Sequence, residues 1–546
     1  MIVPGSANPL LLASFAGYQV PYSLRFRYSN NASLSRTGVA SPTNDKVFTW
    51  SGWVKLGLAV TNNADYGVLF SGYTANSDSG YGVITISNPI AGFPALRVGG
   101  WATNYRITSA AFRDPSAWYH IVVAIDTTNA TAGDRIKIYV NGTQITSFGT
   151  SNNPTLNQTM GMNNASTAQR LGLDAPASSA YHYDGYMAEV NFIDGQALTP
   201  SSFGQTDSAT GVWVPKKYAG TYGTNGFYLK FADASAATAT AIGKDSSGNG
   251  NNWTPSGISV TSGVTFDQMT DTPTLNYPVI SPINSQATVT ISEANMASNY
   301  GGASNTGTAL VSIPFPTTGK WYYEHTCIAV GSFDYFAGVM LNRSAAGVTG
   351  NIVVPGTSSN EYAYRFNGDK MIAGVTSAYG SSYTANDVIG VAFDADNLTI
   401  QFYKNNVAQG LISSMPSGQY VAFTQQYGGG STKINFGQRP FSHTPPSGFK
   451  ALNTQNIASA AVTTSGSFTG NAAADGPFIW ANGNPASLTI NGNAVTFGTH
   501  ADKTAGGFKL RTSSASYNTS GTNNWTATAG KRFVQSKKPN NAQVNP

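Results

Sequence analysis

The sequence predicts an all-β protein made of tandem antiparallel β-sandwiches (jelly rolls), with a small C-terminal β-unit and an extended N-terminal arm. Short runs of β-branched and aromatic residues alternate with turns of Gly, Asn, Asp and Ser over most of the chain. Helical periodicity is nearly absent, although Thr199 and Pro200 offer an N-cap and a first-turn residue for one short helical turn. Aromatic residues reach 12% of the chain, which is enough to build hydrophobic cores.

Composition sets further bounds. The 546 residues are too many for one core, and charged residues make up only 10% against about 25% in an average protein. Cys327 is the one cysteine, so no intrachain disulfide can form, and its strand-like neighbours predict a buried apolar side chain. The five histidines are scattered singly, without zinc-ligand spacing.

Residues 1–21 predict an extended arm. The first cation is Arg25, and prolines interrupt the apolar residues, so we expect neither a signal peptide nor membrane insertion. An arm that docks onto another protein fits this composition better than a solvated tail. The candidate anchoring residues of the arm are Pro4, Pro9, Leu10, Leu11 and Leu12.

Residues 22–260 predict the first sandwich, and Asn141-Gly142 is its strongest hairpin signal. The passage that contains residues 226–231 and 245–253 is interpreted as a last hairpin of the first sandwich. A proline-punctuated linker (261–282) leads to the second sandwich (283–450). Residues 451–546 predict a small β-rich unit. Its basic tail (Lys531, Arg532, Lys537 and Lys538) favours a solvated end, so we expect no nucleic-acid partner.

Both sandwiches resemble known families. The first is similar to the laminin-G-like, concanavalin-A-like jelly roll, through residues 23–26, 48–54, 118–122, 139–142 and 183–190. The second resembles the SPRY domain, through residues 321–324, 337–339, 387–391 and 400–406.

The domain order, preceded by the arm, resembles tailed-bacteriophage virion proteins of the fibre, spike or appendage type. That resemblance covers residues 1–450. It implies a location on the virion (tail or particle surface), attachment to other virion proteins through the arm, and a homo-oligomer, a trimer by analogy. It also implies adsorption to a host-surface glycan or receptor.

Two sets of aromatic residues are candidates for carbohydrate binding. Trp101 and Tyr105 lie among Gly and Asn, and a sugar ring needs apolar stacking beside hydrogen-bonding groups. The alternative is that both rings pack against the core. In the second sandwich, Tyr379, Tyr383 and Tyr427 lie in the loops that match the partner-binding end of the SPRY family.

Calcium is the one cofactor that the residues leave open. Asp245 and Asn249 belong to an oxygen-rich glycine turn that resembles the first half of a calcium loop. The twelfth position is Ser256, so the EF-hand pattern fails, and a plain Asx-rich turn is the alternative. Asp184 is a further metal candidate, because some laminin-G-like domains bind calcium at their rim.

No catalytic residues are predicted, and we expect a protein that is not an enzyme. A glycosidase needs two facing carboxylates, and the sequence provides no close pair, although Asp174, Asp184 and Glu189 could converge in the fold. No GxSxG elbow occurs. Two functions therefore stay open, glycan adsorption and a structural decoration or connector of the tail or head. A polysaccharide depolymerase is a third.

Overall fold

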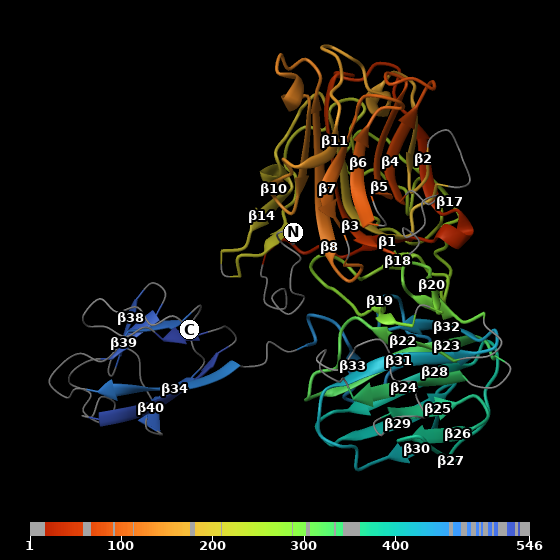
Figure 1. Ribbon diagram of the computed structural model, residues 1–546, viewed down its shortest axis with the longest axis vertical. Coiled ribbons are helices and arrows are strands. Elements are labelled where there is room, and N and C mark those ends of the chain that lie inside the picture. Colours follow the sequence, from red (N-terminus) through yellow and green to blue (C-terminus); the bar gives the residue numbers. More distant parts are fainter. Residues whose placement is uncertain are drawn as a thin grey trace. The chain divides into compact units, whose positions relative to one another are not determined.

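The computed structural model confirms the all-β prediction (Figure 1). It describes residues 17–57, 67–90, 93–112, 114–174, 181–208, 210–286, 288–301, 306–331, 335–341, 361–457, 462–470, 478–481, 487–490, 493–494, 501–504, 507–510, 521–529 and 533–535. Within these ranges the helical elements are short 3₁₀ turns: η2 (Tyr28–Asn30), η4 (Ala132–Asp134), η5 (Gly161–Asn163) and η6 (Pro200–Ser202). None of the helices described could span a bilayer.

The helical turn predicted at Thr199 is confirmed. Pro200 is the first residue of η6, and Thr199 takes the N-cap position in an extended conformation. The Thr199 hydroxyl does not cap the turn, because it contacts the Ser201 hydroxyl at 2.9 Å.

The first sandwich consists of two antiparallel sheets. In spatial order, one sheet contains β10 (Thr143–Gln144), β9 (Ile136–Val140), β8 (Trp118–Asp126), β3 (Val47–Leu56), β13 (Gly185–Asp194), β1 (Ser23–Phe26) and β18 (Gln268–Met269), and β16 (Phe227–Leu229) also pairs with β13. The other contains β11 (Phe148–Ser151), β7 (Tyr105–Ala111), β6 (Phe93–Gly99), β5 (Tyr81–Ile90), β4 (Gly67–Tyr73), β12 (Ala168–Leu171), β2 (Ser33–Thr37) and β17 (Thr254–Ser256).

The core of this sandwich follows from period-2 alternation. On β8, Tyr119, Ile121 and Val123 point inward and meet Trp50 of β3 in one buried cluster. The opposite face of β8 is also buried, because Val122 packs in a second cluster under the segment that carries β14 (Gly204–Thr206) and β15 (Trp213–Pro215). Burial on both faces explains why β8 has an almost continuous apolar sequence.

The hairpin predicted at Asn141-Gly142 is confirmed. The two residues join β9 to β10 with φ angles of 48° and 80°. Two successive positive φ angles are what a two-residue turn with the twist of the flanking strands requires.

The last hairpin predicted around residues 245–253 is wrong. β16 pairs with β13 in one sheet, whereas β17 pairs with β2 in the other. The polar residues between them form a loop that crosses from sheet to sheet. The Asp245 carboxylate accepts backbone N–H groups of Ser247 and Asn251 in this loop and of Tyr228 in β16.

The SPRY-like sandwich also has two sheets. One contains β19 (Ile280–Ser285), β22 (Thr306–Val311), β31 (Tyr420–Tyr427), β24 (Tyr335–Leu341), β25 (Glu361–Arg365), β26 (Asp369–Ile372) and β27 (Val375–Ala378). The other contains β20 (Thr290–Ser292), β21 (Ala297–Asn299), β32 (Ser431–Asn435), β23 (Lys320–Ala329), β28 (Val388–Asp394), β29 (Thr399–Lys404) and β30 (Val407–Ile412), and β33 (Lys450–Ala451) pairs with β23 in parallel. Cys327 on β23 is fully buried, as predicted, and burial and then Asp387 raise the pKa of its thiol to about 12.

Residues 261–282, predicted as a linker, are tied closely to the first sandwich. β18 pairs with β1, and the buried Lys55 ammonium group contacts the Asp271 carboxylate at 2.7 Å. Trp118 donates its indole N–H to the same carboxylate at 3.0 Å. A buried cation that is paired and hydrogen-bonded in this way fixes the path of the chain.

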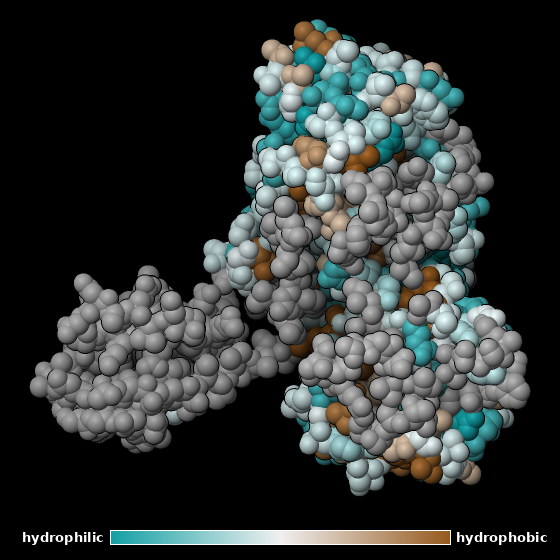
Figure 2. Space-filling model, in the orientation of Figure 1, coloured by the Kyte–Doolittle hydropathy of each residue, from teal (hydrophilic) through white to brown (hydrophobic). Residues whose placement is uncertain are grey.

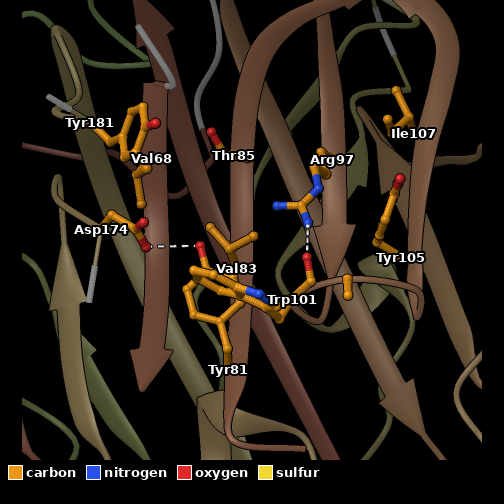
Figure 3. A pocket seen from close by; sticks show the side chains of 11 residues that line it. Val68, Tyr81, Val83, Thr85, Arg97, Trp101, Tyr105, Ile107, Asp174 and Tyr181 are labelled. Carbon is orange, nitrogen blue, oxygen red and sulfur yellow. Dashed lines mark hydrogen bonds between the residues drawn. The ribbon is translucent and has the colours of Figure 1, made fainter. Parts of the chain in front are cut away.

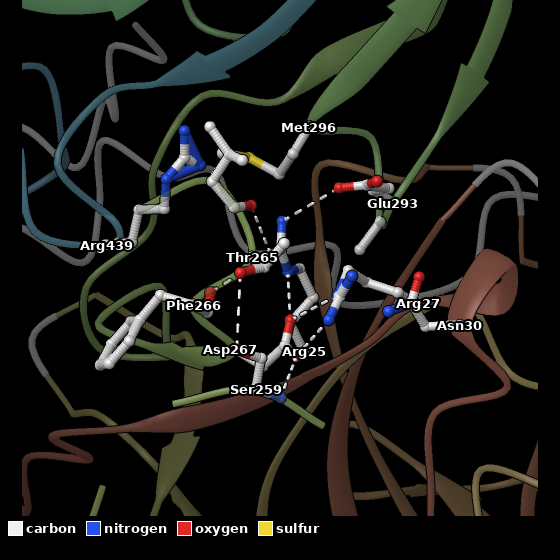
Figure 4. Close-up of polar contacts among 12 residues, drawn as sticks. Arg25, Arg27, Asn30, Ser259, Thr265, Phe266, Asp267, Glu293, Met296 and Arg439 are labelled. Atoms are coloured by element: carbon white, nitrogen blue, oxygen red, sulfur yellow. Dashed lines mark hydrogen bonds and ion pairs between the residues drawn. The ribbon is translucent and has the colours of Figure 1, made fainter. Parts of the chain in front are cut away.

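Charged and polar groups also join the two sandwiches, which belong to one compact unit (Figure 4). The Asp267 carboxylate accepts hydrogen bonds from Arg25 Nε at 3.0 Å and Arg27 Nε at 2.8 Å. Arg25 also lies 3.9 Å from the carboxylate of Glu293, which follows β20. Next to Glu293, the Ala294 carbonyl accepts a hydrogen bond from the Tyr186 hydroxyl of β13.

The strands after Asn456 belong to a second compact unit. One of its sheets contains β34 (Val462–Gly470), β40 (Gly521–Ala529), β36 (Ser487–Ile490) and β37 (Asn493–Ala494), and the other contains β38 (Ala501–Thr504), β39 (Gly507–Leu510), β35 (Phe478–Ala481) and β41 (Phe533–Gln535). The predicted basic tail residues, and the anchoring candidates Pro4, Pro9, Leu10, Leu11 and Leu12, lie outside the described residues.

The described surface in Figure 2 is mostly teal and white, with brown in separate patches. A surface of uncharged polar residues agrees with the low content of charged residues, 10% of the chain.

Candidate functional site

A groove lies on the outward face of β4 to β7 in the first sandwich (Figure 3). Ile84 and Leu96 point into the core, so their neighbours Val83 and Arg97 point to the other face of the sheet. The groove has a volume of about 400 Å³, at the lower end of the range of small-molecule sites. Its lining consists of Val68, Tyr81, Val83, Thr85, Arg97, Trp101, Ala102, Tyr105, Ile107, Asp174 and Tyr181.

Trp101 reaches the groove from the loop between β6 and β7. The Asp78 carboxylate holds this loop, accepting hydrogen bonds from the backbone N–H groups of Ala102 at 2.7 Å and Thr103 at 3.1 Å. Burial raises the pKa of Asp78, but the hydrogen bonds from Thr103 and the loop backbone outweigh it, so the pKa lies below its ordinary value. The loop is therefore fixed by a charged group while the Trp101 side chain stays 43% exposed.

The rings of Tyr81 and Trp101 meet edge to face in the middle of the groove, with centroids 5.3 Å apart. In Figure 3, Asp174 and Tyr181 lie on one side of these rings, and Arg97 and Tyr105 lie on the other. The Arg97 guanidinium carbon lies 4.6 Å from the centroid of the Tyr105 ring. Aromatic faces and polar groups therefore alternate across the groove.

Asp174 and Tyr81 form a buried polar pair. The Tyr81 hydroxyl donates to the Asp174 carboxylate at 2.8 Å. Burial and then the Asp174 charge raise the pKa of Tyr81, so this hydroxyl stays protonated and keeps donating at neutral pH. The groove therefore offers a fixed acceptor on one side and a cation on the other.

Trp101 and Tyr105, the two aromatic residues predicted in the first sandwich, both line the groove. Sequence reasoning missed Tyr81, Arg97 and Tyr181, and weighed Asp174 only as a possible hydrolase acid. Period-2 alternation on β5 is the signal that could have placed Tyr81, Val83 and Thr85 on one face.

The tyrosines predicted in the SPRY-like sandwich do not form a second aromatic site. Tyr383 is only 3% exposed, and its hydroxyl donates to the Tyr364 carbonyl at 2.9 Å, so the prediction of a binding role for it is wrong. Tyr379 is half-buried against Phe402, and its hydroxyl donates to the Gly410 carbonyl. Tyr427 is half-buried at the end of β31. A buried tyrosine usually packs its ring in the core and donates its hydroxyl to a hydrogen-bond partner.

The metal candidates are used for backbone hydrogen bonds instead. The Asp245 carboxylate accepts the N–H groups of Tyr228 at 2.9 Å and Asn251 at 2.9 Å. The Asn249 side chain donates to the Gly223 carbonyl at 2.7 Å. This is the Asx-rich turn that was the alternative to a calcium loop. In the described ranges, no three His, Cys, Asp or Glu residues are grouped so that they could hold a metal ion.

The third metal candidate, Asp184, lies at the junction with the SPRY-like sandwich, where its carboxylate accepts the N–H groups of Tyr28 and Ala294. Nor does the structure bring together the carboxylates weighed for hydrolysis. Asp174 contacts Tyr81, whereas Glu189 accepts a hydrogen bond from Tyr228 at 2.7 Å.

A buried serine–histidine pair is held in a form that cannot act as a base. The His120 ring stacks on Trp53, with centroids 4.8 Å apart, and its Nε2 lies 2.9 Å from the Ser51 hydroxyl. Trp213 donates its indole N–H to His120 Nδ1 at 2.9 Å, so Nδ1 is the acceptor and Nε2 carries the proton. Burial lowers the pKa of His120 to about 3. Because Nε2 is already protonated, this pair cannot activate Ser51.

Comparisons with known proteins agree with the two resemblances. Residues 28–202 match the family model of the concanavalin A-like lectin/glucanases superfamily, and residues 320–439 match that of the SPRY domain. The chain therefore carries a laminin-G-like domain followed by a SPRY domain, as predicted.

Relatives among curated proteins include Ran-binding protein 9 of Danio rerio, which is 30% identical over 169 residues that cover 30% of this chain and 28% of the relative. Ran-binding protein 10 of Danio rerio is 28% identical, over 30% of this chain and 27% of the relative. The chain thus spans only about a quarter of the length of these relatives.

Similar solved structures include the SPRY domain of human HERC1, with 21% identity and a TM-score of 0.25, covering 29% of this chain and 96% of that chain. Stonustoxin has 15% identity and a TM-score of 0.24, covering 29% of this chain and 27% of that chain.

Proposed function

We propose that the chain is a non-catalytic display protein whose laminin-G-like domain binds a glycan in the groove beside Trp101. The observation that carries the proposal is the groove itself. A sugar needs an apolar surface for its C–H face and fixed polar groups for its hydroxyls. Trp101 supplies the first, and Asp174, Thr85 and Arg97 supply the second.

The wider role that we propose is a tailed-bacteriophage virion protein that presents this groove to the host surface. It rests on the order of the two domains and on the predicted N-terminal arm. A homo-oligomer is part of the same proposal, since several weak sites on one particle raise the effective affinity. Two exposed edge strands of the described SPRY sandwich, β27 and β30, carry the exposed Val375, Val407 and Leu411 and could contact another copy.

The test is glycan binding by the purified chain and by Trp101→Ala. Stacking on an exposed indole contributes about 1 kcal/mol or more, so we expect the variant to bind at least fivefold more weakly. Glycan arrays and fluorescence titration would measure this. Tyr22→Ala is the control, because Tyr22 is a half-buried aromatic residue beside β1 in the opposite sheet.

If the wild-type chain binds none of the host's polysaccharides, glycan binding is refuted, and the structural connector becomes the better proposal. The buried ionic groups that join the two sandwiches favour that second function. If the polysaccharide instead releases reducing sugar, the chain is a depolymerase and the non-catalytic role is wrong.

A further inference from the structure

Arg97 places a positive charge in the groove that no carboxylate of the described residues neutralises. It extends from β6 and is half-buried. Its Nη2 donates to the carbonyl groups of Gly100 at 2.9 Å and Trp101 at 3.3 Å. These carbonyls are neutral, so they satisfy hydrogen bonds without balancing the charge.

Asp174 does not supply a counter-ion for Arg97. Its carboxylate accepts the Tyr81 hydroxyl, and the residue is only 7% exposed. In Figure 3, Asp174 lies on one side of the Tyr81 and Trp101 rings, and Arg97 lies on the other side. The accessible charge of the groove is therefore the guanidinium group.

A guanidinium group has five N–H donors, and besides the two carbonyl groups the partner of Arg97 in the described chain is the Tyr81 hydroxyl. Donors of Arg97 therefore remain for a ligand. The Tyr105 ring packs on one face of the guanidinium group, which holds the plane of the donors in place. A guanidinium is weakly hydrated, so an anion displaces its water at modest cost.

The geometry points to an acidic glycan: a sugar whose carboxylate binds Arg97 while its ring stacks on Trp101. This inference rests on the proposed function and names the class of sugar. A carboxylate fits better than a sulfate or phosphate ester, because Arg97 is the one cation among the described residues of the lining and those anions usually collect several donors.

The test compares acidic oligosaccharides with neutral forms of the same chain. Oligogalacturonate, alginate oligosaccharide, hyaluronan oligosaccharide and sialyllactose would each be titrated beside the methyl ester of its carboxylates. A hydrogen bond to a charged group contributes about 1.5–3 kcal/mol, so we expect the free acid to bind about ten- to hundredfold more tightly than the ester.

Three variants make the test specific. Arg97→Gln should abolish the preference for the acid over the ester. Arg97→Lys should keep part of the preference, because the charge remains. Lys230→Gln is the control for general charge, since Lys230 is exposed just after β16 in the other sheet and should leave the preference unchanged. Thermal melting of each variant would check that the loop of Trp101 remains folded.

Each outcome either supports or overturns the inference of an acidic glycan. Loss of the preference in Arg97→Gln alone supports the inference. Equal binding of acid and ester, tighter binding of the ester, or binding to sulfated oligosaccharides only would overturn it and leave glycan binding standing. An equal loss in Arg97→Gln and Lys230→Gln would overturn it as well, because the effect would then be general charge. If none of the oligosaccharides binds, the inference fails, and the glycan array decides separately whether the proposed function stands.

Discussion

The carboxyl group of Asp184 is buried at the junction of the two sandwiches. Burial raises its pKa to about 6, although the N–H groups of Tyr28 and Ala294 donate to it and oppose this shift. Its ordinary pKa is 3.8, so the folded protein binds a proton more tightly than the unfolded chain between about pH 4 and pH 6. The stability from this group is therefore present in full below about pH 4 and is lost as the pH rises through 6.

Asp184→Asn tests this residue directly. The amide has the shape of the protonated acid and carries no charge, so the variant should gain stability over the wild type as the pH rises from 5 to 8. A pKa of about 6 in place of 3.8 corresponds to about 3 kcal/mol in total, of which about half is lost between pH 5 and pH 8, and thermal melting at both pH values would resolve that difference.

Asp387→Asn is the matched control, because the pKa of Asp387 is shifted in the opposite direction to that of Asp184. Burial raises the pKa of Asp387, but hydrogen bonds from Thr384 and Asn405 outweigh it and hold the pKa below its ordinary value. Its replacement should cost stability above about pH 4. An Asp184→Asn effect that is equal at pH 5 and pH 8 would contradict the role given to burial.

At the scale of elements, the β9–β10 hairpin shows how local chemistry fixes a turn. Gly142 has a φ of 80°, and a Cβ atom there would lie 2.5 Å from the Trp213 ring. Gly142→Ala should therefore destabilise the fold through both strain and a clash, by about 2 kcal/mol or more.

Substitutions at two other glycines separate the effect of backbone strain from the effect of the steric clash. Gly248 has a φ of 98° with no atom within 4 Å of the added Cβ, so Gly248→Ala should show strain alone. Gly133 also has an empty surrounding and an ordinary φ, so Gly133→Ala should change little. Denaturant unfolding of the three variants would rank them, and a Gly142→Ala effect no larger than that of Gly248→Ala would rule out the clash.

The same scale explains what the sequence could and could not predict. The Asn141-Gly142 turn, the η6 turn and the burial of Cys327 depend on neighbours in the chain, and all three predictions are confirmed. The groove depends on sheet order, which brings Tyr81, Arg97 and Asp174 together from separate strands and loops. The predicted last hairpin failed for the same reason, because β16 and β17 are neighbours in sequence but pair in different sheets.

At the scale of the whole molecule, the two sandwiches are connected through an unusual backbone segment. Glu293, Ala294 and Asn295 all have positive φ angles, of 55°, 57° and 63°. The Ala294 N–H donates to Asp184, and the Asn295 side chain donates to the Leu56 carbonyl. Three left-handed residues in a row are costly, and the contacts with the first sandwich offset that cost.

Opposite substitutions at Ala294 test this connection. Ala294→Gly should stabilise the protein by up to about 1 kcal/mol, because glycine adopts the left-handed conformation without strain. Ala294→Pro should destabilise it, because proline removes the N–H donor and cannot reach a positive φ.

Calorimetry of the two Ala294 variants would show how strongly the sandwiches are coupled. We expect the wild type and Ala294→Gly to unfold both sandwiches in one transition, and Ala294→Pro to separate the transition into two. Two separate transitions in the wild type would show that the sandwiches unfold independently.

The buried thiol of Cys327 on β23 has a practical consequence for labelling the protein. Cys327 is the only cysteine of the chain, it is fully buried, and its pKa is about 12. Maleimide dyes react with accessible thiolates, so the native protein should stay dark at neutral pH. A cysteine introduced at an exposed position such as Val407 would then carry one fluorophore or spin label without first deleting the native residue.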